Sequence, residues 1–163
     1  MYEYQVYIAN LGKYNEGELV GDWFTFPIDF EEVKERIGLN ERYEEYAIHD
    51  YEFPINLSEF TSIDELNNMY EKIEELPSHI VDNLEDFVSY FGSLEDIDED
   101  KVLLHAGCSS MVDVAYELVD EYEIFGSLPE VAQRYFNYES FARDLGIEGT
   151  WIETSSGMCA ILW

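Results

Sequence analysis

The sequence predicts an α+β protein of three small consecutive domains, residues 1–57, 58–101 and 102–163. Three observations support this division. Apolar and polar residues alternate near both ends of the chain, as they do in half-buried strands, whereas apolar residues in the middle recur at helical spacing. The middle also holds the densest run of acidic side chains. Because no low-complexity linker separates these parts, we expect the domains to be joined tightly.

The first domain is predicted to contain strand, strand, helix and strand in that order. Alternation indicates strands over residues 2–10, 20–26 and 44–53. Between the second and third strands, Asp29 is placed to cap a helix through its side chain, and Gly38 is placed to end that helix. These elements predict a small α/β module.

The middle domain combines helix signals with an excess of negative charge. Residues 58–100 contain fourteen acidic residues and a single lysine. The segment 62–65 fits a capping box at the start of a helix over 63–75. A second helix is predicted over 77–92, and a third, shorter one starts at Ser93. The apolar faces of these helices predict an ordered acidic scaffold rather than a disordered tract.

The last domain is predicted to be α/β as well. Residues 102–106 predict a buried strand, and residues 109–122 predict a long helix capped by a serine. Further helices are expected from Pro129 and over 138–145, and a hairpin over 149–163 completes the domain. The apolar face of the long helix spans roughly 160°, wide enough for both an internal core and a partner.

The net charge of −29, from 37 acidic and 8 basic residues, is spread over all three domains. It repels nucleic acid and anionic membranes, and it attracts basic surfaces or cations. B-form DNA carries one charge per ~1.7 Å of axis, so the charge of this chain corresponds to roughly 50 Å of duplex. Adaptation to high salt is the alternative, and it predicts acidity without a particular geometry.

Carboxylates recur on single helix faces. Asp64, Glu71 and Glu75 fall within roughly 40° of one another on the helix over 63–75. A similar stripe is expected in the helix over 109–122. An ordinary solvated face alternates charges of opposite sign, because like charges at this spacing destabilise a helix. The near absence of Lys and Arg therefore predicts a rigid array of negative charge presented to a basic groove.

A calcium loop is only partly matched. Asp96, Asp98 and Asp100 resemble the start of such a loop, but Lys101 stands where a glycine is needed and Gly107 where a glutamate is needed. A dedicated metal site is therefore not expected. A cation-binding or calcium-responsive acidic protein stays open as the second interpretation.

The sequence patterns of common enzyme sites are absent. His49, His79 and His105 have no metal-ligand spacing, and Ser109 lacks the second glycine of a nucleophile elbow. A hydrolase that uses a carboxylate pair is a third interpretation, since any two of the 37 acidic residues could meet. We expect no enzyme activity, no catalytic residue and no cofactor.

Cysteine content and hydropathy favour a cytoplasmic location. Cys108 and Cys159 do not form a CxxC motif and are expected to be reduced. The N-terminus lacks the features of a signal peptide, and no apolar run approaches the ~20 residues of a membrane span.

Three segments resemble the ArdA antirestriction proteins. Residues 9–23 carry A-x-L-x-x-Y-N-x-G-x-L-x-G-x-W, residues 45–52 read EYAIHDYE, and residues 135–145 read YFNYESFARDL. The resemblance covers nearly the whole chain in order. It implies an elongated molecule of three small domains, encoded on a mobile genetic element, that mimics B-form DNA and dimerises through its C-terminal domain. It also implies occupation of the DNA-binding groove of type I restriction–modification enzymes, and no catalytic residue.

The partners expected from this resemblance are the methyltransferase core of a type I enzyme, with its specificity-subunit groove, and a second copy of the chain. Nucleic acid and membranes are not expected as partners. We predict dimer contacts on the wide apolar face at Ala115, Leu118, Val119 and Tyr122. The carboxylates predicted to take the place of phosphates are Asp64, Glu65, Glu71, Glu75, Asp82, Glu85, Asp86, Glu95, Asp96, Asp98, Glu99, Asp113, Glu117 and Asp120.

Overall fold

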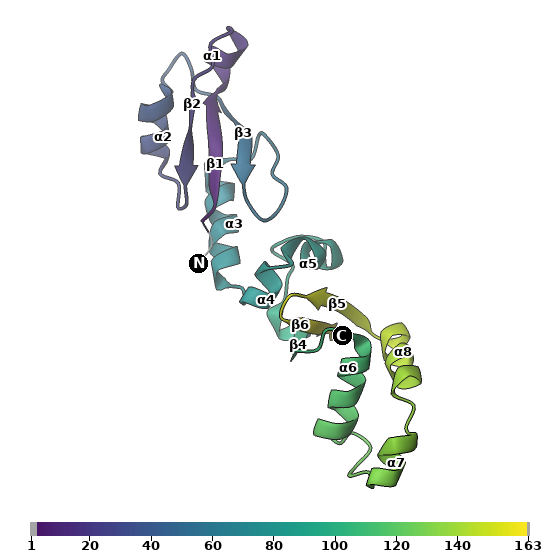
Figure 1. Ribbon diagram of the computed structural model, residues 1–163. Helices are drawn as coiled ribbons and strands as arrows, with labels where there is room; N and C mark the ends of the chain where they lie inside the picture. Colours follow the sequence, from purple (N-terminus) through teal and green to yellow (C-terminus); the bar gives the residue numbers. More distant parts are fainter. Residues whose placement is uncertain (1–2, 163) are drawn as a thin grey trace. The chain divides into compact units, whose positions relative to one another are not determined.

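Two three-stranded antiparallel sheets, each covered by helices, organise the structure (Figure 1). This computed structural model describes residues 3–162. The chain divides into two compact units, Met1–Leu76 and Pro77–Trp163. The predicted mixture of helices and small sheets is confirmed. The division into three domains stays a prediction, and the helix expected to open the middle domain belongs to the first unit.

The first unit is built around strand β1. Its sheet has the order β2-β1-β3, with all neighbours antiparallel. Val6 and Ile8 on β1 are fully buried, and they pack with apolar residues of helices α2 and α3. The elements of this unit are β1 (Gln5–Asn10), α1 (Leu11–Asn15), β2 (Gly21–Thr25), α2 (Phe30–Ile37), β3 (Tyr46–Glu52) and α3 (Ile63–Glu75).

The predicted helix caps of the first unit are present. The Asp29 side chain accepts a hydrogen bond from Glu31 N at 2.9 Å and so begins α2. Gly38 ends α2 with a φ of 72°, a left-handed conformation that favours glycine. At the start of α3, Glu65 N donates to Ser62 Oγ, and Ser62 N donates to the Glu65 carboxylate. This capping box fixes the first turn of an acidic helix.

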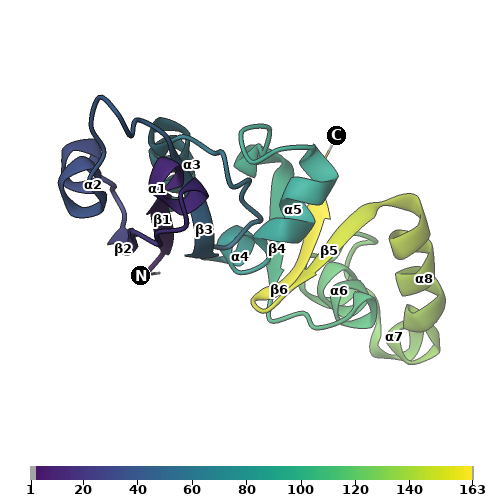
Figure 2. The ribbon, with the colours of Figure 1, turned by 90° about the horizontal axis from the view of Figure 1, so that it is seen from above.

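The second unit has the sheet order β4-β6-β5. Figure 2 shows α6 and α8 side by side next to this sheet. The strands are β4 (Val102–Ala106), β5 (Thr150–Thr154) and β6 (Gly157–Ile161). The helices are α4 (Ser78–Val81), α5 (Leu84–Phe91), η1 (Glu99–Lys101), α6 (Met111–Tyr116), η2 (Glu117–Glu121), α7 (Glu130–Tyr135) and α8 (Tyr138–Glu148).

The prediction of a single helix over 77–92 is wrong. The chain forms α4 and α5 instead, because Asn83 between them has φ −132° and ψ 38°, which is not helical. Asparagine competes with helical hydrogen bonding through its side chain, so a break at this position is chemically reasonable. The helix expected from Ser93 is also absent. Ser93 Oγ instead accepts from Asp96 N at 3.2 Å and donates to the Asp96 carboxylate, which makes a local turn.

The long helix predicted over 109–122 changes its geometry half-way. Ser110 caps α6, as expected, by accepting from Asp113 N. After Tyr116 the chain continues as the π-helix η2, in which Tyr122 N bonds to Glu117 O at 3.0 Å. A π-helical turn holds more residues than an α-helical one, so it rotates the side chains that follow.

The core of the second unit lies where α6 and η2 pack on α8. Ala115, Val119, Tyr138 and Ala142 are buried there. A second cluster around Cys108, Val114 and Met158 joins α6 to the sheet, and the partly buried Trp151 packs against it. No helix within residues 3–162 combines the length and the apolar content that crossing a membrane requires.

Candidate functional site

The predicted phosphate-mimicking carboxylates lie on the surface, with one exception. Thirteen of the fourteen are exposed, and Glu117 is not. The exposed ones are Asp64, Glu65, Glu71 and Glu75 in the first unit, and Asp82, Glu85, Asp86, Glu95, Asp96, Asp98, Glu99, Asp113 and Asp120 in the second. Whether they act as phosphate substitutes stays a prediction.

Helix α3 shows how the fold holds these groups. Ile63, Leu66 and Ile73 are buried in the core of the first unit. The opposite face carries the exposed side chains of Asp64 and Glu71. Because the buried face fixes the rotation of the helix, the carboxylates have defined positions relative to the sheet.

Several acidic residues stabilise the helices on which they lie. Asp64 and Glu65 occupy the first turn of α3, and Glu85 and Asp86 occupy the first turn of α5. Negative charge at a helix N-terminus interacts favourably with the helix dipole. This local gain offsets part of the repulsion between like charges. It also means that acidity at these positions has a structural explanation beside any functional one.

Basic residues neutralise carboxylates in the first unit. Arg36 lies 2.6 Å from Asp22 and 3.0 Å from Glu32. Lys34 pairs with Glu31, and Arg42 with Glu16, each at 3.7 Å. None of these four acidic partners belongs to the predicted phosphate-mimicking set.

The second unit largely lacks such neutralisation. Its sequence holds 18 acidic residues and three Lys or Arg. Within residues 77–162, the carboxylates other than Asp82 have no Lys or Arg nitrogen within 4.0 Å. Its three Lys and Arg residues are too few to offset 18 acidic residues, so the unit can present most of its negative charge to a basic partner.

Two carboxylates beside α6 are held by hydroxyl groups. Asp113 accepts hydrogen bonds from Ser109 N at 3.0 Å and from Ser109 Oγ at 2.9 Å, and these bonds lower the pKa of Asp113. Asp120 accepts from the Tyr138 hydroxyl at 2.7 Å, which is the main cause that raises the pKa of Tyr138 to about 12. Both carboxylates remain exposed and have fixed orientations.

Glu117 points inward, away from the predicted stripe. Its Oε2 accepts a hydrogen bond from Cys108 Sγ at 2.7 Å, and its Oε1 lies 3.3 Å from His105 Nδ1. The side chain is 12% exposed. Hydrogen bonds from Cys108, and then from Tyr122 and His105, lower the pKa of Glu117 although burial acts in the opposite direction. We conclude that this carboxylate stays charged as part of a buried polar cluster.

The same cluster argues against a nucleophilic cysteine. Burial, followed by the hydrogen bond to Glu117, raises the pKa of the Cys108 thiol to about 12. A thiol reacts as the thiolate, so Cys108 is poorly suited to nucleophilic attack near neutral pH. Among residues 3–162, no group of three or more His, Cys, Asp and Glu side chains has the arrangement of a metal site.

Comparison with known families decides the identity. The sequence model of the antirestriction protein ArdA matches residues 6–160, nearly the whole chain. The chain belongs to the ArdA family. A search of curated proteins returns no match. Membership in the ArdA family implies an antirestriction function and an interaction with restriction enzymes. ArdA is a family of antirestriction proteins and is not a known enzyme family.

The four dimer residues predicted for this ArdA chain fall into two groups. Ala115 and Val119 are buried in the core of their own unit, at 0% and 2% exposure. Their side chains are therefore unavailable to a partner in this conformation. Leu118 is half-buried, and Tyr122 is 63% exposed. The dimer itself stays a prediction.

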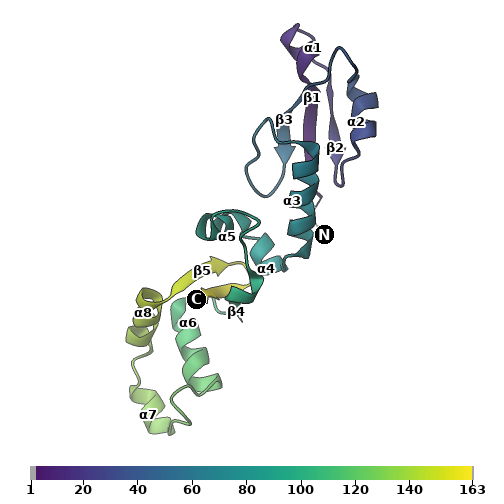
Figure 3. The same ribbon diagram turned by 180° about the vertical axis from the view of Figure 1, so that it is seen from behind.

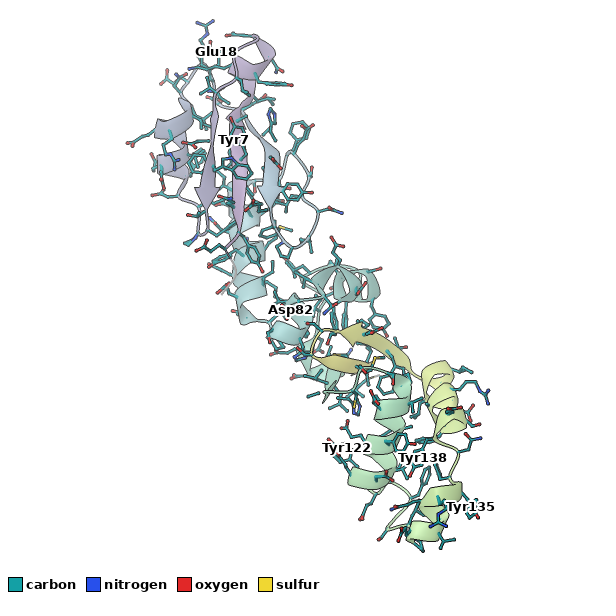
Figure 4. The ribbon with its side chains drawn as sticks, in the orientation of Figure 1. Tyr7, Glu18, Asp82, Tyr122, Tyr135 and Tyr138 are labelled. Carbon is teal, nitrogen blue, oxygen red and sulfur yellow. The ribbon has the colours of Figure 1, made fainter. Side chains whose placement is uncertain are left out.

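Sequence reasoning identified only Tyr122 of a set of exposed apolar side chains in the same unit of this ArdA chain. It comprises side chains of α6, α7 and the segment that joins η2 to α7, and we call it the α6–α7 apolar surface. Figure 4 labels two of its members, Tyr122 near the end of α6 and Tyr135 on α7. Its members are Tyr116, Tyr122, Ile124, Phe125, Val131 and Tyr135. Tyr122 was predicted as part of the wide apolar face, and the mixed apolar and acidic sequence over 116–135 could have indicated the other members.

Proposed function

We propose that this protein mimics B-form DNA and occupies the DNA-binding groove of type I restriction–modification enzymes, in the methyltransferase core at the specificity subunit. One observation supports this most directly. Exposed carboxylates stand on packed elements, and in the described part of the second unit those other than Asp82 form no ion pair with Lys or Arg. An array of carboxylates held in fixed positions can bind in a groove whose Lys and Arg side chains bind phosphates.

The mechanism we propose does not depend on DNA sequence. Proteins bind the phosphate backbone through Lys and Arg, and these contacts supply much of the affinity without reading bases. A protein that offers carboxylates to the same Lys and Arg competes with DNA of any sequence. The thirteen exposed carboxylates are our candidates for these contacts, whereas Glu117 supports the fold.

We further propose that the active form is a homodimer. The α6–α7 apolar surface includes Tyr135 and Val131, which are 80% and 61% exposed. Exposed apolar side chains that gather on one surface are typical of protein interfaces. Burying this surface between two copies would remove it from water and would combine two acidic surfaces in one inhibitor. We place the protein in the cytoplasm, encoded on a mobile element, and assign it no catalysis.

Inhibition of a purified type I enzyme tests this function. The protein is titrated into a cleavage reaction on unmodified DNA, and polyglutamate at the same total charge concentration is the control. We expect inhibition at near-stoichiometric protein and far weaker inhibition by the control, since polyglutamate has no fixed arrangement of charges. Equal inhibition by both would show that charge alone acts, and would contradict mimicry.

A further inference from the structure

Strand β5 forms one edge of the sheet of the second unit, beside helix α5 (Figure 3). An open groove of about 770 Å³ runs along this edge, lined by residues of both elements. Within residues 3–162, the backbone groups of Thr150–Thr154 make no backbone hydrogen bond outside the ladder with β6. The outer edge of β5 is therefore free to pair.

The ladder identifies which backbone groups of β5 face outward. Gly107 N donates to Ser156 O at 3.0 Å, and Leu162 N donates to Lys101 O at 2.7 Å. Hydrogen-bonded positions alternate along an antiparallel pair, so the even-numbered residues of β6 bond to β4 and the odd-numbered ones bond to β5.

The partners of the odd-numbered β6 residues are Thr150, Ile152 and Thr154. Trp151 and Glu153 alternate with them, so their N–H and C=O groups point away from the sheet. These two residues supply two donors and two acceptors to the open groove. A strand that docks on this edge would pair with them.

Acidic and polar side chains line the groove. Asp86 on α5 and Glu153 on β5 are exposed, and neither forms an ion pair with a described residue. The Asn83 Nδ2 atom is buried and has no hydrogen-bond partner in residues 3–162. Tyr90 contributes an aromatic ring that is 41% exposed. The lining thus offers negative charge and an aromatic surface.

We propose that the β5 edge binds an extended basic segment of a partner protein as a fourth strand of the sheet. The backbone of the segment would pair with Trp151 and Glu153, as in strand addition to other exposed sheet edges. Its side chains would alternate between the two faces of the sheet. Basic side chains on either face meet a carboxylate, Asp86 on one side and Glu153 on the other.

Charge selects this occupant over a second copy of the chain. A second copy would bring its own Asp86 and Glu153 to the same acidic groove, and like charges held close together across strands are destabilising. A basic segment is instead attracted by the carboxylates of the groove. This proposal goes beyond DNA mimicry, since it needs a strand-shaped ligand and a defined hydrogen-bond register, and it would stand if the DNA-binding groove were not the target.

Two peptides of equal charge test the proposal on the full-length protein. The probe is a seven-residue peptide of alternating arginine and threonine, acetylated and amidated. The control has the same sequence with methyl groups on two consecutive central amides, which blocks both hydrogen-bonding edges. We expect the probe to bind at least about fivefold more tightly, because in the control one of the two methyl groups faces β5, removes a hydrogen-bond donor there and keeps the strands apart. Equal affinity would overturn the proposal.

Hydrogen exchange and a second set of variants locate the site. The probe should protect the amides of Trp151 and Glu153, and exchange at these amides that is unchanged by bound probe would overturn the proposal. The double variant Asp86→Asn, Glu153→Gln should bind the probe about fivefold or more weakly than wild type does. The control variant Glu139→Gln, Glu148→Gln removes the same charge from α8. It should lower the affinity for the probe by less than about twofold.

A proline tests the strand edge itself. Glu153→Pro removes an N–H that points away from β6, so the ladder keeps its hydrogen bonds. This variant should retain the circular dichroism spectrum and lose the preference for the unmethylated peptide. If the protein instead self-associates without peptide and Glu153→Pro abolishes that association, the edge binds a second copy and the proposal fails.

Discussion

The Cys108 thiol donates a hydrogen bond of 2.7 Å to Glu117, a carboxylate that helical spacing places on the surface. The contact joins the loop after β4 to η2, and His105 on β4 approaches the other carboxylate oxygen. A buried carboxylate with several donors rigidifies the elements that surround it. Glu117 therefore has a structural role that the exposed carboxylates of the chain do not share.

Replacement of Glu117 should reduce stability. Glu117→Gln leaves Cys108 and His105 with an imperfect partner in a buried site, so we expect the free energy of unfolding to fall by about 1–3 kcal/mol. Glu121→Gln removes the same charge from an exposed neighbour and should change it by less than about 0.5 kcal/mol. Urea denaturation followed by circular dichroism measures both. Equal effects of the two variants would contradict the structural role of Glu117.

Acid should weaken the fold partly through the same residue. The pKa of Glu117 is lower in the folded protein than its ordinary value of 4.5. Its contribution to stability is therefore present above pH 4.5 and is lost as the pH falls through the folded pKa. The difference in unfolding free energy between wild type and Glu117→Gln should shrink as the pH falls below that value. A difference that stays constant or grows on acidification would contradict the assignment.

Neutralising the exposed face of α3 should weaken inhibition in steps. Asp64→Asn, Glu71→Gln and Glu75→Gln each remove one exposed charge. Each should raise the protein concentration that gives half-maximal inhibition of the restriction enzyme by no more than about fivefold. The triple variant should be weaker than any single one. Glu139→Gln, Asp144→Asn and Glu148→Gln on α8 are the control with the same charge change. A complete loss from one substitution would indicate a specific site rather than an array.

The α6–α7 apolar surface should control self-association. Tyr135→Ser and Val131→Ser remove exposed apolar side chains, so they should raise the dimer dissociation constant while stability changes by less than about 0.5 kcal/mol. Leu19→Ser replaces an equally exposed residue of the first unit and should leave association unchanged. Val119→Ala truncates a buried side chain and should cost stability, by about 1–3 kcal/mol. Sedimentation equilibrium separates the two classes, and a dimer unaffected by Tyr135→Ser would contradict this assignment.

Local signals in the sequence predicted much of the fold. The Ser62–Glu65 capping box, the cap at Asp29 and the stop at Gly38 depend on residues a few positions apart, so the sequence contains the whole signal. The alternation that buries Val6 and Ile8 is local in the same way. The exposed carboxylates of α3 followed from this, because the buried face fixes the exposed one.

The features that sequence reasoning missed depend on contacts between distant parts of the chain or on irregular backbone. Glu117 turns inward because Cys108 and His105, from other elements, supply its hydrogen-bond donors. The π-helical turn at Glu117–Glu121 disrupts the regular spacing on which the predicted stripe and the dimer face relied. The stacking of Tyr116 on Tyr138, with ring centroids 3.9 Å apart, likewise joins two helices that no local pattern connects.

Competition for a DNA-binding groove tests the central claim most directly. A purified type I methyltransferase core is bound to labelled duplex, and the protein is titrated in at several salt concentrations. We predict displacement at close to one dimer per enzyme, with an apparent affinity that falls steeply as salt rises, because the interaction is between charges. Absence of displacement at every salt concentration would contradict DNA mimicry.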